Sequence, residues 1–208
     1  GNGFILNLLK PMSVTPILAL IGIIFYKFCR SEKKKAIGSI LLGFTVLMLG
    51  INAMSSAVGG LADVPQFAKF LLLFENPILA VALGAIFTAI FQSSSASVGI
   101  LQVLTVTGGI SYGTAVPIIM GQNIGSCITA LLSAVGANRN AKRAAFVHFS
   151  FNLIGTAVLL AVFIAVRALL QPAFLNSPAD SVGIAAAHSL FNILTTLLLL
   201  PMSGLLEK

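Results

Sequence analysis

The stretch that decides the fold is 77–97, PILAVALGAIFTAIFQSSSAS. An apolar arm of 15 residues comes first, and the mostly polar run Gln92–Ser97 follows it. As a helix this arm is only about 22 Å long, whereas the hydrocarbon core of a bilayer is about 30 Å thick. A second short apolar arm, 98–107, ends at Gly108-Gly109. Two arms that are each too short to cross, joined by a polar tip, predict a re-entrant helical hairpin over 77–109.

The composition indicates that this hairpin belongs to a membrane protein. Of the 208 residues, 58% are apolar and 8% are charged, against roughly 25% charged in an ordinary soluble domain. The 63 residues 76–138 carry no charged side chain. A soluble domain could not bury so much apolar surface, and disorder needs low hydrophobicity with high charge. We therefore expect an all-α polytopic protein with the lipid bilayer as its partner.

Further apolar segments extend this reading outward from the hairpin. The crossing segment 115–135 contains GQNIGS at 121–126, which predicts a helix broken near its middle. Spanning helices are predicted for 36–58, 144–170 and 182–206, with a shorter apolar helix at 13–28 and an interfacial amphipathic helix within 59–76. The predicted organisation is a preceding helix with a basic loop, 1–35, and a transmembrane repeat unit, 36–208.

The positive charges predict the orientation of these segments. The basic loops around Lys33–Lys35 and Arg139–Arg143 lie on the same side of the membrane only if the hairpin re-enters. Nine of the 12 Lys and Arg then face the cytoplasm, as the positive-inside rule requires. Topology thus accounts for the net charge of +7, and we expect no nucleic-acid partner.

Two features of the chain bear on its context. It opens at Gly1-Asn2-Gly3 without a methionine, so we expect a piece of a longer protein. Cys29 and Cys127 lie far apart in apolar surroundings, and a disulfide framework is not expected.

The two polar interruptions are the candidate binding elements. Irregular backbone at membrane depth is tolerated only where protein or water surrounds it. The hairpin tip offers hydroxyls and the N-terminal end of the second arm, where anions are favoured. Asn123, Ser126 and Thr129 recur every three residues and share a helical face. Their uncharged oxygens, with carbonyls freed at the predicted break, suit a monovalent cation, whereas plain helix packing is the alternative.

Two histidines are a further candidate. His148 and His188 are each followed four residues later by an asparagine, Asn152 and Asn192. A proton relay or metal site is one reading, and hydrogen bonds that fix helix packing are the other. An intramembrane serine hydrolase would need one of these histidines as its base, but no G-x-S-x-G motif is present. We therefore expect no enzyme and keep the hydrolase as an alternative.

The two polar motifs together resemble the bacterial branch of the type II sodium–phosphate cotransporters. QSSSASVGI at 92–100 is similar to the QSSS hairpin of that family, and GQNIGSCITA at 121–130 is similar to its G-x-N-I-G-T-x-x-T-A segment. The resemblance runs from about Gly38 to the end of the chain and implies the second of two inverted repeats. It implies sodium-coupled symport of inorganic phosphate across the bacterial cytoplasmic (inner) membrane, with sodium as coupling ion and no cofactor.

The resemblance also implies roles for individual residues. Sodium ligands, with no other metal, are implied at Gln92, Ser93, Gln122, Asn123, Ser126 and Thr129. Phosphate contacts are implied at Ser93, Ser94, Ser95 and Asn123.

The chain also departs from the family pattern. Gln122 stands where Ala or Ser is common, and Ser126-Cys127 replaces Thr-Thr. The chain holds one QSSS motif where the family has two, so half a site is implied. The implied partner is the other repeat, in the same longer chain or a second copy. A half-transporter of another small anion, working as an oligomer, is the alternative.

Overall fold

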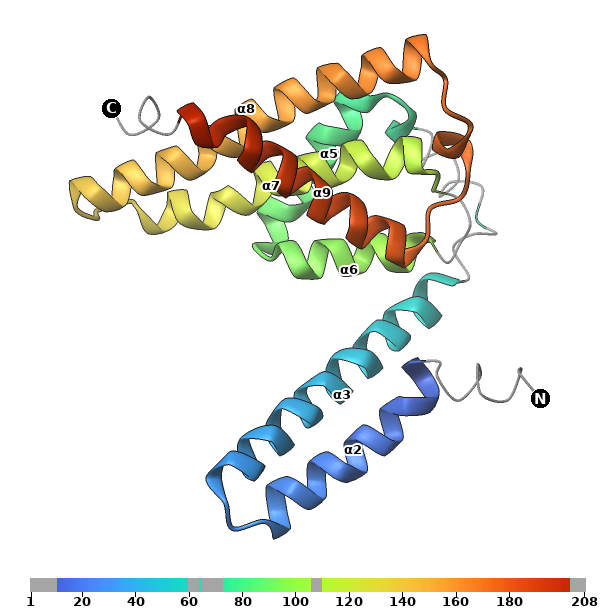
Figure 1. The fold of residues 1–208 in the computed structure, drawn as a ribbon, viewed down its shortest axis with the longest axis vertical. Coiled ribbons are helices and arrows are strands. Elements are labelled where there is room, and N and C mark those ends of the chain that lie inside the picture. The colour runs from blue at the N-terminus through green and yellow to red at the C-terminus, as the bar shows by residue number, and fades with distance from the viewer. Residues whose placement is uncertain (1–10, 60–63, 65–72, 106–109, 203–208) are drawn as a thin grey trace. The chain divides into compact units, whose positions relative to one another are not determined.

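The computed structural model describes residues 11–59, 64, 73–105 and 110–202. These residues are helical almost throughout (Figure 1), and among them the only β pairing is an isolated bridge between Ser111 and Pro178. The helices long and apolar enough to cross a membrane are Glu32–Met54, Tyr112–Ser133, Arg139–Leu169 and Ser181–Leu199. The predicted all-α, multi-pass architecture is confirmed.

The chain divides into two compact units, 1–57 and 58–208. The first holds α2 (Pro11–Phe28) and most of α3 (Glu32–Gly59), which run side by side (Figure 1). A Cβ atom on Gly38 would lie 2.8 Å from the Gly22 carbonyl oxygen, so these glycines allow a close helix approach. The predicted division at 35/36 stays a prediction.

The second unit contains the helical hairpin that the sequence predicts. Its arms are α5 (Pro77–Phe91) and α6 (Ser94–Thr105), and only Gln92 and Ser93 lie between them. The side-chain oxygen of Asn76 caps α5 by accepting a hydrogen bond of 2.9 Å from the Ile78 N–H. The hairpin is therefore present, and its re-entry into a bilayer stays a prediction. Residues 106–109 lie outside the described part of the chain.

The predicted break in the helix after the hairpin is wrong. Helix α7 (Tyr112–Ser133) continues through Gly121–Ser126 without interruption. The polar side chains bond back to their own helix, because Asn123 Nδ2 donates to the Ile119 carbonyl (2.8 Å) and Ser126 Oγ to the Asn123 carbonyl (2.7 Å). The backbone carbonyls expected to be freed there remain within a regular helix.

Two long helices complete the second unit. They are α8 (Arg139–Leu169) and α9 (Ser181–Leu199). Helix α8 begins five residues before the span predicted at 144–170, and α9 ends seven residues before the end of the span predicted at 182–206. The short 3-10 turns are η2 (Leu73–Glu75), η3 (Ala173–Asn176) and η4 (Leu200–Met202). Most of the predicted interfacial helix within 59–76 lies outside the described residues.

Helix α7 is the centre of the second unit. It contacts α5, α6, α8 and α9, and its contact with α5 is the most extensive (Figure 1). Cβ atoms on Gly84 and Gly121 would collide with the carbonyl oxygens of Ile118 and Val81, respectively. The two backbones therefore touch, and this contact fixes the first hairpin arm beside the polar segment of α7.

Candidate functional site

The hairpin tip is built from a left-handed residue and a helix cap. Gln92 has φ 54° and ψ 23°, and its N–H donates to the Thr88 carbonyl (2.7 Å), which ends α5. Ser93 then caps α6, because its Oγ accepts a hydrogen bond of 3.2 Å from the Ala96 N–H. The Gln92 side chain is exposed and that of Ser93 is half-buried. The tip thus turns the chain within two residues and presents the positive end of a helix.

The serines that follow belong to the first turn of α6. Ser94 is half-buried, Ser95 is exposed, and Ser97 is fully buried. Within the described chain, the Ser97 Oγ has no hydrogen-bond partner. Sequence reasoning gave Ser97 no separate role, although it closes the QSSSAS run.

The second candidate motif lies on α7, and most of it is buried. Gln122 is 1% exposed and Asn123 is 6% exposed. Ser126 is half-buried, and Thr129 is exposed. The face predicted for Asn123, Ser126 and Thr129 therefore runs from the interior of the unit to its surface.

One hydrogen bond joins the two motifs. Gln122 Nε2 donates to the Ser97 carbonyl oxygen at 3.0 Å, and both groups are buried. The bond therefore connects α6 to α7 in the interior of the unit, whereas Gln92 at the tip is exposed. In the part of the chain that the structure describes, no hydrogen bond links Gln92 or Ser93 to Asn123.

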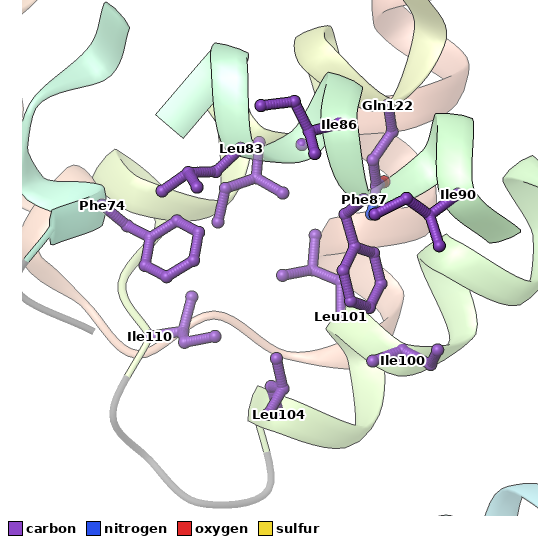
Figure 2. A pocket seen from close by; sticks show the side chains of 12 residues that line it. Phe74, Leu83, Ile86, Phe87, Ile90, Ile100, Leu101, Leu104, Ile110 and Gln122 are labelled. Carbon is purple, nitrogen blue, oxygen red and sulfur yellow. The ribbon is translucent and has the colours of Figure 1, made fainter. Parts of the chain in front are cut away.

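Besides the Ser97 Oγ, two buried oxygens on α5 and α7 have no described partner. They are Gln122 Oε1 (Figure 2) and the hydroxyl of Thr88, whose residue is 0% exposed. Thr88 faces α7, since a Cβ atom on Gly125 would lie 2.8 Å from the Thr88 Cβ. Thr88 lies one helical turn before Gln92, and this spacing is a signal by which the sequence could have identified it. The candidate site thus contains more buried, unpartnered oxygens than the motifs alone indicate.

The histidines occupy a different place in the unit. Cys127 Sγ lies 3.8 Å from His148 Nε2, and Asn152 Nδ2 donates to that sulfur at 3.3 Å. Asn152 and Asn192 also donate to the carbonyls of His148 and His188, at 3.0 and 2.8 Å. The Cys127 contacts connect α7 to α8, and the two asparagine–carbonyl bonds lie within α8 and within α9. This geometry is the one expected if the histidine–asparagine pairs fix helix packing.

The described residues offer no geometry for a metal site or for the base of a serine hydrolase at these histidines. Among the described residues, no group of three or more His, Cys, Asp or Glu could hold a metal ion. In the same residues, neither histidine hydrogen-bonds to a serine of the hairpin. The nucleophile–base pair that a serine hydrolase needs is not formed there.

Several apolar helices around buried polar side chains, with a hairpin of two short arms, are typical of a multi-pass membrane protein. The chain belongs to the Na+/Pi-cotransporter family, whose model matches residues 64–199. The match includes both polar motifs, so the family predicted from them is confirmed.

Some of the proteins similar to this chain are named for phosphate export or phosphate transport. A Bacillus subtilis (strain 168) protein, "Uncharacterized protein YqeW", is 32% identical over 193 residues, which are 92% of this chain and 62% of the relative. The "Putative inorganic phosphate export protein YjbB" of Salmonella typhimurium is 28% identical over 196 residues, or 94% of this chain and 36% of the relative. The human "Sodium-dependent phosphate transport protein 2B" is 36% identical over 140 residues, or 62% of this chain and 20% of the relative.

These relatives are longer than the chain, which spans between 20% and 62% of their lengths. No solved structure matches the chain.

Proposed function

We propose that this chain forms one half of a transporter that moves inorganic phosphate across a bacterial inner membrane, coupled to sodium. The observation that carries the proposal is the Gln122–Ser97 hydrogen bond, which joins the hairpin to the polar face of α7. Relatives named for phosphate export and for sodium-dependent phosphate transport support the substrate and the ion. The other repeat, in the same longer chain or in a second copy, completes the site in this proposal.

The absence of charge supports coupling to a cation. No acidic or basic side chain occurs in 76–138, so this part of the chain cannot neutralise a phosphate by itself. Bound sodium and the positive end of α6 would supply the compensating charge. Sodium would be held by oxygens of Gln92, Ser93, Gln122, Asn123, Ser126 and Thr129, and phosphate would contact Ser93, Ser94, Ser95 and Asn123.

The bond from Asn123 Nδ2 to the Ile119 carbonyl fits this assignment. It leaves the side-chain Oδ1 of Asn123 available as a ligand, since an amide oxygen is an acceptor with two lone pairs. Gln122 Oε1 is likewise an unpaired acceptor within the described chain. Each residue would thus use its NH2 group for structure and its oxygen for the ion.

The test is radiolabelled phosphate flux through the complete protein in proteoliposomes. We expect flux to follow an imposed sodium gradient and to fall by at least tenfold when choline replaces sodium. Equal flux in both media would overturn the coupling, and saturable sulfate flux with no phosphate flux would overturn the substrate. Reversing the gradient should reverse the direction of net phosphate flux, because a coupled carrier follows the gradient in either direction.

A matched pair of serines on α7 tests the site. Ser126→Ala removes a proposed ligand, whereas Ser133→Ala removes an exposed hydroxyl at the end of the same helix. We expect Ser126→Ala to raise the sodium concentration for half-maximal flux about tenfold and Ser133→Ala to leave it unchanged. If the two variants behave alike, the polar face of α7 serves helix packing and binds no sodium.

A further inference from the structure

Positive charge is concentrated at the short turn between α2 and α3. Residues 29–31 alone separate the end of α2 at Phe28 from the start of α3 at Glu32, and the two helices run side by side from this turn (Figure 1). Five basic residues therefore gather at one end of the helix pair. They are Lys27, Arg30, Lys33, Lys34 and Lys35. We call this set the basic turn.

Most of this charge has no carboxylate to neutralise it. Glu32 is the only acidic residue in the sequence 1–57, and its carboxylate pairs with Lys35 Nζ at 2.9 Å. The other four cations are exposed. Two of them, Lys33 and Lys34, lie in the first turn of α3, where the positive end of the helix dipole adds to their charge. The basic turn therefore favours an anion.

Close packing of the two helices holds these cations together. A Cβ atom on Gly38 would lie 2.6 Å from the Tyr26 nitrogen and 2.8 Å from the Gly22 carbonyl oxygen. Gly38 comes one helical turn after Lys34, and Tyr26 directly precedes Lys27. Like charges fixed near each other repel. The positive-inside orientation requires cations on the cytoplasmic side, and it does not require that they be held together, so a bound anion is the better account of their grouping.

The place of the basic turn in the chain puts it at the membrane surface. Helix α3 is long and apolar enough to cross a membrane from Glu32 onward, and a crossing helix has its ends at the level of the lipid headgroups. Apolar side chains adjoin the turn on both helices. Phe28 at the end of α2 is 73% exposed, and Ile37 on α3 is 47% exposed. Charge and apolar surface side by side suit an amphiphile with an anionic head.

We propose that the basic turn binds the headgroup of an anionic phospholipid, with its acyl chains against the exposed apolar side chains. Arg30 is able to bind a phosphate through two N–H groups, and the lysines act on it as point charges. Clusters of basic residues beside a membrane-crossing helix attract anionic lipids in this way. A soluble polyanion would gain the charge but not the apolar contact. The proposal does not rest on phosphate transport.

Lipid binding is tested on the complete protein in detergent by native mass spectrometry, which counts the lipids bound. Phosphatidylglycerol is anionic and phosphatidylcholine is zwitterionic, and both are used with identical acyl chains. Each cation near an anionic lipid strengthens binding about fivefold, so we expect the first phosphatidylglycerol to bind at least about tenfold more tightly than phosphatidylcholine. Equal affinities would overturn the proposal.

Matched double variants locate the bound lipid. Lys27→Gln with Lys34→Gln removes two exposed cations and should reduce the preference about tenfold. Arg139→Gln with Lys142→Gln removes the same charge from the start of α8, where residues are also exposed, and should change the preference less than about twofold. A preference that survives the first variant, or that falls equally in both, would overturn the site.

A charge-conserving variant separates loss of the lipid from loss of structure. Lys27→Arg with Lys34→Arg changes the same two side chains and keeps their charge, so the preference should remain. If it falls as far as in the glutamine variant, the substitutions act through the packing of α2 on α3, and the lipid assignment is overturned.

A headgroup without acyl chains separates a lipid from a soluble anion. Glycerophosphoglycerol has the charge of phosphatidylglycerol, and inorganic phosphate is the second probe. We expect no measurable binding of either at the basic turn, because the contact with apolar side chains is missing. Glycerophosphoglycerol that binds as tightly as the lipid would show recognition of charge alone and would overturn the lipid assignment. None of these measurements involves flux, so failure of the proposed function would leave them standing.

Discussion

The two arms of the hairpin are held in opposite ways. Helix α5 meets α7 backbone to backbone, with Gly84 against the Ile118 carbonyl and Gly121 against the Val81 carbonyl. Helix α6 has an open glycine instead, because a Cβ atom on Gly99 would meet nothing within 4 Å. Amide hydrogen bonds attach this arm, including Gln122 to the Ser97 carbonyl (3.0 Å). One arm is thus fixed by close backbone packing, and the other by polar contacts together with buried apolar side chains such as Leu101 and Val103.

The difference indicates which arm is able to move. Close backbone packing is short-ranged, and a small displacement loses most of its dispersion energy. A hydrogen bond between helices in a membrane contributes about 0.6 kcal/mol on average, and its partners can be exchanged. We therefore infer that α5 and α7 form a rigid pair and that α6 is the movable arm. The predictions below test this assignment.

The largest effect is expected from a methyl group placed between α5 and α7. Gly121→Ala puts a Cβ atom against the Val81 carbonyl oxygen, and such overpacking should destabilise the protein by about 1–3 kcal/mol. Gly99→Ala on α6 is the matched control and should be neutral or stabilising by up to about 1 kcal/mol, because alanine is the better helix former. Thermal unfolding in detergent measures both. Equal losses would contradict the distinction between the arms.

The next effect concerns the bond that joins α6 to α7. Gln122→Met removes the donor to the Ser97 carbonyl and should cost about 0.5–1.5 kcal/mol. The loss should also be local, with faster hydrogen exchange in 94–105 than in 77–91. Hydrogen–deuterium exchange with mass spectrometry gives this contrast directly. A uniform increase over both arms would mean that α5 and α6 move as one body.

The sequence predicted the first hairpin arm and the presence of a second, but not how they are held. The second arm was predicted at 98–107, whereas α6 begins at Ser94, because the serines predicted as a polar tip form its first turn. The arm 77–91 coincides with α5 because Asn76 and Pro77 are strong helix-start signals and the polar tip is a strong stop. The break predicted at 121–126 is wrong for a related reason. The sequence pattern does not distinguish a glycine that interrupts a helix from a glycine that allows another helix to pack closely against it. That distinction depends on α5, a tertiary partner.

The candidate site was likewise predicted in part. The motifs identified Gln122, and the structure pairs it with Ser97, a residue given no separate role. Cys127 on α7 and His148 on α8 are 21 residues apart in sequence, and no local spacing rule encodes their contact. Periodicity assigns residues to a face of one helix, whereas contacts between helices depend on how those helices cross.

A smaller effect is expected at Gln102, the glutamine of the movable arm itself. Gln102 Nε2 donates to the Ser181 carbonyl at 3.0 Å, in an exposed position. Gln102→Leu should cost about 0.5 kcal/mol or less, because exposed hydrogen bonds exchange readily with water. The same exchange experiment should show faster opening at the C-terminal end of α6 only. If opening extends to Ser97, the two glutamines hold the arm cooperatively, and the arm moves as a single rigid helix.

The smallest effect on stability is expected within the fixed arm, at Thr88. Its hydroxyl is buried and has no partner in the described chain, whereas the Thr105 Oγ1 on α6 donates to the Gln102 carbonyl at 2.6 Å. Thr88→Val should therefore be neutral or slightly stabilising, since it removes an unpaired polar atom, and Thr105→Val should cost about 0.5–1.5 kcal/mol. Thermal unfolding and sodium-dependent flux are measured together. A Thr88→Val protein that keeps its stability but loses its sodium dependence would show that this hydroxyl is held unpaired for an ion, and would extend the site from the movable arm to the fixed one.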